Sequence, residues 1–130
     1  MGISGGGMHT FFSTCLDERI RACVISGYYS SFKASILGMH HCTCNYVPGL
    51  WRFGEEHDLI GLIAPRPVLI EAGTYDPIFP VDAVREGVKI AREKVYAVFG
   101  ASDQVETDIF EGRHRINGRR AYDFLWKKLS

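Results

Sequence analysis

The sequence carries no excess of either charge, because 15 Lys and Arg residues balance 15 Asp and Glu residues. This balance gives no electrostatic reason to expect nucleic acid or an anionic membrane surface as the main partner. No apolar run approaches the ~20 residues of a membrane-spanning helix, and the first residues lack the charged-then-apolar order of a secretion signal. We therefore expect neither a nucleic acid nor a membrane as a partner.

Cysteine is scarce as well, with four residues in the whole chain. Four cysteines are too few for a disulfide scaffold at this length. Cys15 and Cys23 fall in apolar patterns, where a free thiol behaves as a small hydrophobic side chain. This pattern favours a reducing compartment, and we expect a cytoplasmic location.

The remaining composition is that of a globular protein, with 46% hydrophobic and 23% charged residues in 130 positions, which suits one domain over 1–130. Hydrophobic periodicity predicts alternating helices and strands. Strands are expected at 20–26, 68–72 and 104–110, and helices at 5–16, 57–63, 80–99 and 118–129. This order is typical of a parallel sheet between helices, so the sequence predicts an α/β fold in the form of a three-layer sandwich.

A long segment without periodicity, 28–56, interrupts this order, and we expect it to be an insertion that lies over an active site. Its aromatic residues Tyr28, Tyr29 and Trp51 are candidates for lining an acyl or sugar pocket. They could equally pack the loop against the domain. Both interpretations stay open.

The same segment contains His40, His41, Cys42 and Cys44, which suggest a zinc site completed by an acidic residue or histidine from 55–57. The spacing differs from the Cys-x2-Cys of structural zinc sites, and adjacent histidines rarely point toward one metal ion. We therefore expect no metal site and interpret the cluster as part of a structural loop.

A serine between glycines opens the chain, in the order Gly2-Ile3-Ser4-Gly5-Gly6. The pattern Gly-x-Ser-x-Gly is typical of a nucleophile elbow, a tight strand-to-helix turn that exposes the serine hydroxyl. The backbone N–H of Gly5, at the start of the predicted helix, is a candidate oxyanion donor. Glycine-rich turns around a serine also occur without catalytic function.

Two further residues support the catalytic interpretation of Ser4. Asp76 follows the strand expected at 68–72, and His114 follows the strand expected at 104–110, so both should lie with Ser4 at the carboxyl edge of the sheet. The chain order Ser, Asp, His is that of α/β-hydrolases and differs from that of other serine hydrolases. The alternative for Asp76 is a simple turn residue, because Asp-Pro is a common turn pair.

Four segments together resemble α/β-hydrolases of the dienelactone hydrolase and acetyl xylan esterase type, which are related to prolyl-oligopeptidase-like catalytic domains. They are the elbow (2–7), the Asp-Glu-Arg-Ile segment and its strand (17–27), the Ala-Pro-Arg-Pro segment with the acid turn (64–80) and the base loop (110–114). The resemblance spans nearly the whole chain and implies the C-terminal part of an α/β-hydrolase fold. The strands before the elbow are expected to be absent.

The resemblance implies a serine hydrolase that needs no cofactor and cleaves a small carboxylic ester through an acyl-enzyme. Ser4 would be the nucleophile, His114 the general base and Asp76 the residue that orients the base. The second oxyanion donor would come from a loop before the elbow, which implies reduced activity for this chain. Two alternatives remain: a peptidase-like amide hydrolase, and an inactive module that forms homo-oligomers through the exposed edge of the strand at 20–26.

Overall fold

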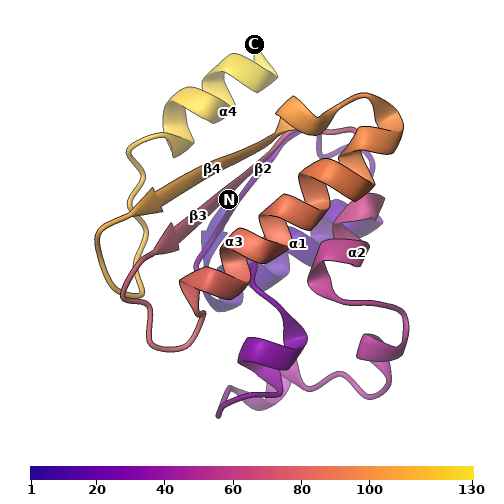
Figure 1. Cartoon of the computed structure of the whole chain (residues 1–130). Helices are drawn as coiled ribbons and strands as arrows, with labels where there is room; N and C mark the ends of the chain where they lie inside the picture. Colours follow the sequence, from indigo (N-terminus) through magenta and orange to yellow (C-terminus); the bar gives the residue numbers. More distant parts are fainter.

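A four-stranded parallel sheet forms the centre of the computed structural model, which describes all residues from Met1 to Ser130 (Figure 1). The strands lie in the sheet in chain order, as β1 (Gly2–Ile3), β2 (Cys23–Ser26), β3 (Val68–Gly73) and β4 (Val105–Phe110). Every neighbouring pair is parallel. The carboxyl ends of all four strands therefore meet at one edge.

Helices cover both faces of this sheet. They are α1 (Gly5–Leu16), α2 (Glu56–Leu59), α3 (Val81–Ile90) and α4 (Ala121–Leu129). Figure 1 shows α1, α2 and α3 on one face and α4 on the other. This arrangement confirms the predicted three-layer α/β fold. None of the helices combines the length and the apolarity that crossing a membrane requires.

Short helical turns supplement the four α-helices. α3 continues through one wide turn and one tight turn to Gly100, which has a left-handed conformation at φ 64°. The turns are η1 (Phe32–Ile36), η2 (Thr43–Asn45), η3 (Leu50–Arg52), η4 (Ile60–Leu62), η5 (Ala91–Val95), η6 (Tyr96–Phe99) and η7 (Ser102–Gln104). The segment 28–56 is therefore folded into turns, as the failure of periodicity suggested.

Two hydrophobic clusters hold the layers together, because successive strand residues point to opposite faces of the sheet. Ile25 and Ile70 face the larger cluster, under α1 and α3. Val24 and Leu69 face a smaller cluster with Phe124 of α4. Both faces of β2 and β3 are thus buried, which explains why these strands read as continuous apolar runs.

Two details of the first strands differ from the sequence-based expectations. The strand expected at 20–26 pairs only from Cys23, which lies opposite Val68. A two-residue strand, β1, precedes Ser4 and pairs with β2, where no strand before the elbow was expected. β1 occupies the outer position of the sheet and pairs with Ile25 and Ser26, so it covers this part of the edge that was expected to be exposed, and association through the edge stays a prediction.

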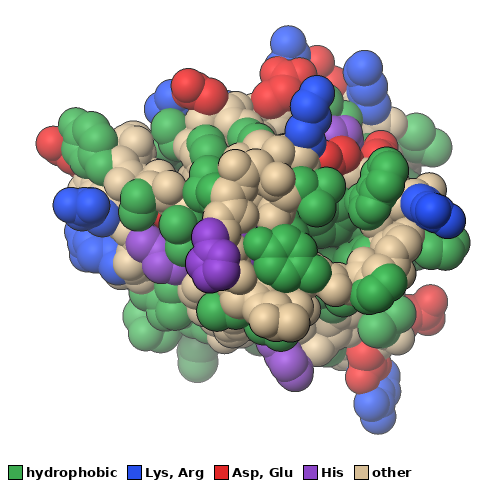
Figure 2. All heavy atoms as spheres, turned by 90° about the horizontal axis from the view of Figure 1, so that it is seen from below, with side chains coloured by type: hydrophobic (Ala, Val, Ile, Leu, Met, Phe, Trp, Pro, Cys, Tyr) green, Lys and Arg blue, Asp and Glu red, His purple; other side chains and the backbone are tan.

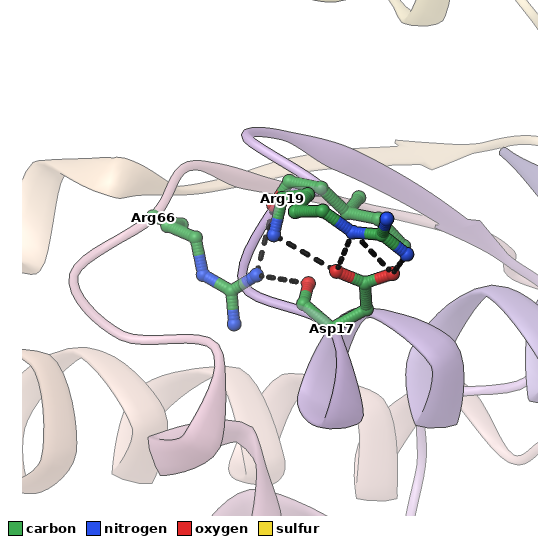
Figure 3. Close-up of polar contacts among 4 residues, drawn as sticks. Asp17, Arg19 and Arg66 are labelled. Carbon is green, nitrogen blue, oxygen red and sulfur yellow. Dashed lines mark hydrogen bonds and ion pairs between the residues drawn. The ribbon is translucent and has the colours of Figure 1, made fainter.

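At the amino edge of the sheet, Arg66 joins α1 to the β2 and β3 region. Figure 3 shows its guanidinium directed at the backbone carbonyl of Asp17, while the carboxylate of Asp17 pairs with Arg19. The guanidinium donates five hydrogen bonds of 2.8–3.0 Å, to the carbonyls of Ile63, Asp17, Ile20, Thr14 and Leu62. The bonds to Thr14 and Asp17 satisfy carbonyls at the C-terminal end of α1, and the bonds to Leu62 and Ile63 tie this end to η4.

Two adjacent carboxylates fix the start of the segment 28–56. Glu55 accepts hydrogen bonds from the backbone N–H of Phe32 and of Lys33, at 2.7 and 3.0 Å. Glu56 is fully buried and accepts the N–H of Ser30 at 2.5 Å. Burial, with a smaller contribution from the neighbouring Glu55, raises the pKa of Glu56 to about 8, although the hydrogen bond from Ser30 lowers it.

α1 packs very closely on β2, and glycine makes this approach possible. A Cβ on Gly7 would lie 2.7 Å from the carbonyl oxygen of Ser26 and 2.8 Å from Cβ of Tyr28, whereas a Cβ on Gly6 would meet nothing within 4 Å. We therefore expect Gly7→Ala to lower the free energy of unfolding by about 1–3 kcal/mol through overpacking. Gly6→Ala is the matched control and should raise it by up to about 1 kcal/mol. Urea denaturation of both variants measures the two effects, and equal stability of the variants would contradict this account.

A second prediction concerns pH. Between the ordinary pKa of 4.5 and about 8, Glu56 is protonated in the folded state and ionised in the unfolded state. The folded state then binds more protons, so this residue makes the free energy of unfolding fall as pH rises, by up to about 1.4 kcal/mol per unit. Denaturation from pH 5 to 8 should show a shallower fall for Glu56→Gln than for the wild type. The exposed control Glu18→Gln should keep the wild-type slope.

Candidate active site

Ser4 lies between β1 and α1 in a strained conformation. Its φ is 56° and its ψ is −119°, and it is the one non-glycine residue of the chain with a positive φ. Its N–H donates to the carbonyl of Ser26 at 3.1 Å. A Cβ at position 2 would collide with the carbonyl of Gly6, so the turn before Ser4 requires glycine at this position. Strain of this kind costs about 1–3 kcal/mol and is typical of functional turns.

Asp76 and His114 lie together at the carboxyl edge of the sheet. Oδ2 of Asp76 is 2.7 Å from Nδ1 of His114. Oδ1 of Asp76 accepts the backbone N–H groups of Ile78 and Phe79, both at 3.0 Å. The side chain of Asp76 is 1% exposed, so the carboxylate is held on both oxygens. An acceptor at Nδ1 keeps the proton there and leaves Nε2 available as a base.

Backbone contacts hold the acid turn against the base loop. The N–H of Thr74 donates to Phe110 at 2.9 Å, and the N–H of Tyr75 donates to Gly112 at 2.8 Å. Gly73 allows this approach, because a Cβ there would lie 2.5 Å from the carbonyl oxygens of Gly112 and Arg113. The distance between Asp76 and His114 is thus set by main-chain bonds.

A second buried carboxylate, Glu71, supports the same edge and was not identified from the sequence. It lies on β3, is 1% exposed, and accepts the hydroxyl of Ser26 at 2.7 Å. It also accepts the N–H groups of Asn117 and Gly118, at 2.6 and 2.8 Å, from the loop after His114. An acidic residue within an otherwise apolar strand was the available signal for such a role.

The ring of His114 is positioned next to the elbow, but no hydrogen bond joins Nε2 of His114 to Oγ of Ser4. Nε2 is buried and has no partner. A Cβ on Gly27 would lie 3.2 Å from the His114 ring, so the imidazole packs against the residue that follows Ser26. Because Ser26 also accepts the N–H of Ser4, His114 and Ser4 both lie next to the end of β2. Catalytic hydrogen bonds often close only when substrate binds.

A cavity of ≈ 220 Å³ opens beside Ser4. Gly5, the first residue of α1, also lines it, and the N–H of this residue belongs to the unpaired first turn of the helix. Tyr28 lines the cavity too, and burial raises the pKa of its hydroxyl above the usual range. The predicted oxyanion donor and one of the three predicted pocket residues therefore lie at the same cavity as Ser4.

The other two predicted pocket residues lie elsewhere. Tyr29 is buried in the core and donates its hydroxyl to the carbonyl of Gly87 at 3.1 Å. Tyr29 is not among the residues that line the cavity beside Ser4. Trp51 lines a different cavity of ≈ 320 Å³, formed by segment 28–56 itself.

Several residues that were not predicted individually as site residues also line the cavity beside Ser4, five of them in segment 28–56. These residues, which the sequence analysis assigned to a structural loop or to the acid turn, are His40, His41, Cys42, Cys44, Asn45, Ile78 and Phe79. Figure 2, which views the molecule from below, shows histidine and hydrophobic side chains on that face, with charged side chains mostly toward its rim. No three His, Cys, Asp or Glu side chains of the chain converge as metal ligands would. The signal that could have revealed the cavity was the density of polar and aromatic residues in 28–56.

Comparison with known proteins places this geometry in context. No protein-family model matches the sequence. The chain is 34% identical over 109 residues to the putative hydrolase YtaP of Bacillus subtilis (strain 168), and the match covers 79% of the chain. It covers 35% of YtaP, so the chain spans about a third of the curated relative.

Solved structures show the same fold. A carbohydrate esterase family 15 glucuronoyl esterase from Caldicellulosiruptor kristjansonii superposes with a TM-score of 0.77 at 23% identity, over 95% of this chain and 40% of that one. Methylesterase BT1017 superposes with a TM-score of 0.74 at 26% identity, over 99% of this chain and 29% of that one. Together with the parallel sheet and the elbow, these likenesses confirm the fold that the sequence predicted: the chain has the structure of one part of an α/β-hydrolase domain.

Proposed function

We propose that the chain carries the catalytic residues of a serine hydrolase that cleaves carboxylic esters through an acyl-enzyme. The observation that carries the proposal is the 2.7 Å contact between Asp76 and His114, at the edge of the sheet where Ser4 has a strained backbone. The likeness to a putative hydrolase and to esterases supports ester hydrolysis more than amide hydrolysis.

In this mechanism His114 Nε2 removes the proton from Ser4 Oγ as Oγ attacks the ester carbonyl carbon. The C=O electrons move onto oxygen, and the N–H of Gly5 stabilises the negative charge. When the intermediate collapses, the bond to the leaving alkoxide breaks and His114 returns the proton to it. A water molecule then attacks the carbonyl carbon of the acyl-enzyme while His114 takes its proton. When this second intermediate collapses, His114 returns the proton to Oγ of Ser4 and the acid is released. Asp76 stabilises the imidazolium of His114 during both acylation and deacylation.

The buried, unpartnered Nε2 of His114 supports this assignment. A buried polar atom without a hydrogen bond costs about 1–3 kcal/mol. Structural histidines normally satisfy both ring nitrogens, whereas a general base keeps one free for the nucleophile's proton. The unpaired Nε2 of His114 is therefore consistent with a general base that forms its hydrogen bond to Ser4 when an ester binds.

The first test of this function is covalent labelling. A fluorophosphonate should modify Ser4, because its hydroxyl is the activated nucleophile, and peptide mapping by mass spectrometry identifies the site. Ser4→Ala should abolish labelling, and Ser102→Ala, at an exposed position, should leave it unchanged. Labelling at another residue, or none at all, would refute the proposal.

The second test addresses Asp76. Asp76→Asn should slow phosphonylation of Ser4 by up to about 10⁴-fold, the loss seen when the acid of a serine-protease triad is replaced, because the imidazole loses its tautomer. Asp82→Asn is the control, since that side chain is 94% exposed. The rate constant from time courses of intact mass gives the comparison. Similar rates for the two variants would show that Asp76 does not orient the base.

A further inference from the structure

The cavity beside Ser4 contains one polar group whose hydrogen-bonding role the surrounding protein fixes, the imidazole of His41. This side chain is 8% exposed, and its Nε2 lies 3.0 Å from Oγ of Ser35. The hydroxyl of Ser35 donates its single proton to the carbonyl of Ile78 at 2.6 Å. Oγ of Ser35 can therefore only accept from His41, so the proton of the imidazole is on Nε2.

The other ring nitrogen of His41 is consequently a bare acceptor. Burial lowers the pKa of His41, so the ring is neutral at pH 7. Nδ1 has no hydrogen-bond partner in the protein, and it is not among the polar atoms sealed from solvent. His41 lines the cavity that Ser4 and Gly5 also line, so this cavity is open space beside the ring.

The position of Phe79 shows which half of an ester the cavity suits. Its ring stacks on His114, with centroids 5.6 Å apart, and meets the edge of His41 at 5.3 Å. Phe79 therefore separates the two imidazoles. The leaving group has to reach Nε2 of His114 to receive its proton. His114 does not line the cavity, so the cavity is suited to the acyl half.

The charge of the cavity narrows the chemistry further. No Lys, Arg, Asp or Glu is among its lining residues. Its volume of ≈ 220 Å³ is below the ~300 Å³ at which pockets for drug-sized ligands begin. A small, uncharged acyl group fits both observations.

We infer that His41 is a specificity-determining residue whose Nδ1 accepts a hydrogen bond from a hydroxyl group on the acyl part of the substrate. This inference rests on the proposed function and names its substrate class: esters of small, uncharged hydroxy acids. An acyl group that lacks the hydroxyl leaves Nδ1 without a partner in the closed complex, and the site disfavours it for that reason.

The test uses two fluorophosphonates whose alkyl groups have the same length and differ by one hydroxyl. The wild-type chain should be phosphonylated at Ser4 faster by the hydroxylated probe, by about 3- to 10-fold, which is the value of one hydrogen bond. His41→Phe, of similar size and without an acceptor, should bring the ratio of the two rate constants close to 1. His57→Gln, outside the cavity, should keep the wild-type ratio.

The outcomes separate the two claims. If neither probe modifies Ser4, the proposed function is wrong. If both probes modify Ser4 of the wild type at equal rates, the function stands and the role of His41 is overturned, and this comparison does not depend on whether His41→Phe folds. A preference that persists in His41→Phe also overturns it. A general loss of structure would slow both probes and would not change their ratio.

Discussion

The carboxylate of Glu71 joins the parts of the candidate active site. It lies inside the sheet on β3, and it accepts one hydrogen bond from β2 and two from the loop that follows His114. A buried polar group that loses its hydrogen-bond partners destabilises the fold by about 1–3 kcal/mol. The side chain of Glu71 thus holds the end of β2 and the loop after His114 in one arrangement. Ser4 is hydrogen-bonded to the same end of β2.

The strain at Ser4 depends on the packing of α1. Gly7 lets the helix approach β2 within a distance that no side chain would allow, and Arg66 satisfies carbonyls at the opposite end of the helix. With both ends held, the turn before the helix cannot relax by moving the helix away. The positive φ of Ser4 is therefore maintained by contacts distant from the hydroxyl itself.

The sequence predicted the features that depend on local pattern. The helix at 5–16 has the predicted bounds, because periodic apolar residues follow a glycine-rich turn and Asp17 ends the helix. The strand at 20–26 was predicted too long, since its first three residues, Ile20 to Ala22, have no partner on β3. The alignment of Glu71 with Asn117 and the folding of His41 toward the elbow depend on contacts between distant segments. Hydrophobic periodicity contains no information on such contacts.

The two ends of β3 lie in different parts of the molecule: one is next to the anchor of Arg66, and the other is next to Asp76 and the candidate active site. β3 has six residues, so about 20 Å separates the Arg66 end from the Asp76 end at 3.3 Å per residue. Effects of substitutions more than about 7–10 Å apart are usually additive. The effects on the free energy of unfolding of substitutions in the cavity beside Ser4 and of substitutions at the five-bond anchor of Arg66 should therefore add. Such a division lets substrate preference diverge during evolution while the architecture that supports it is retained.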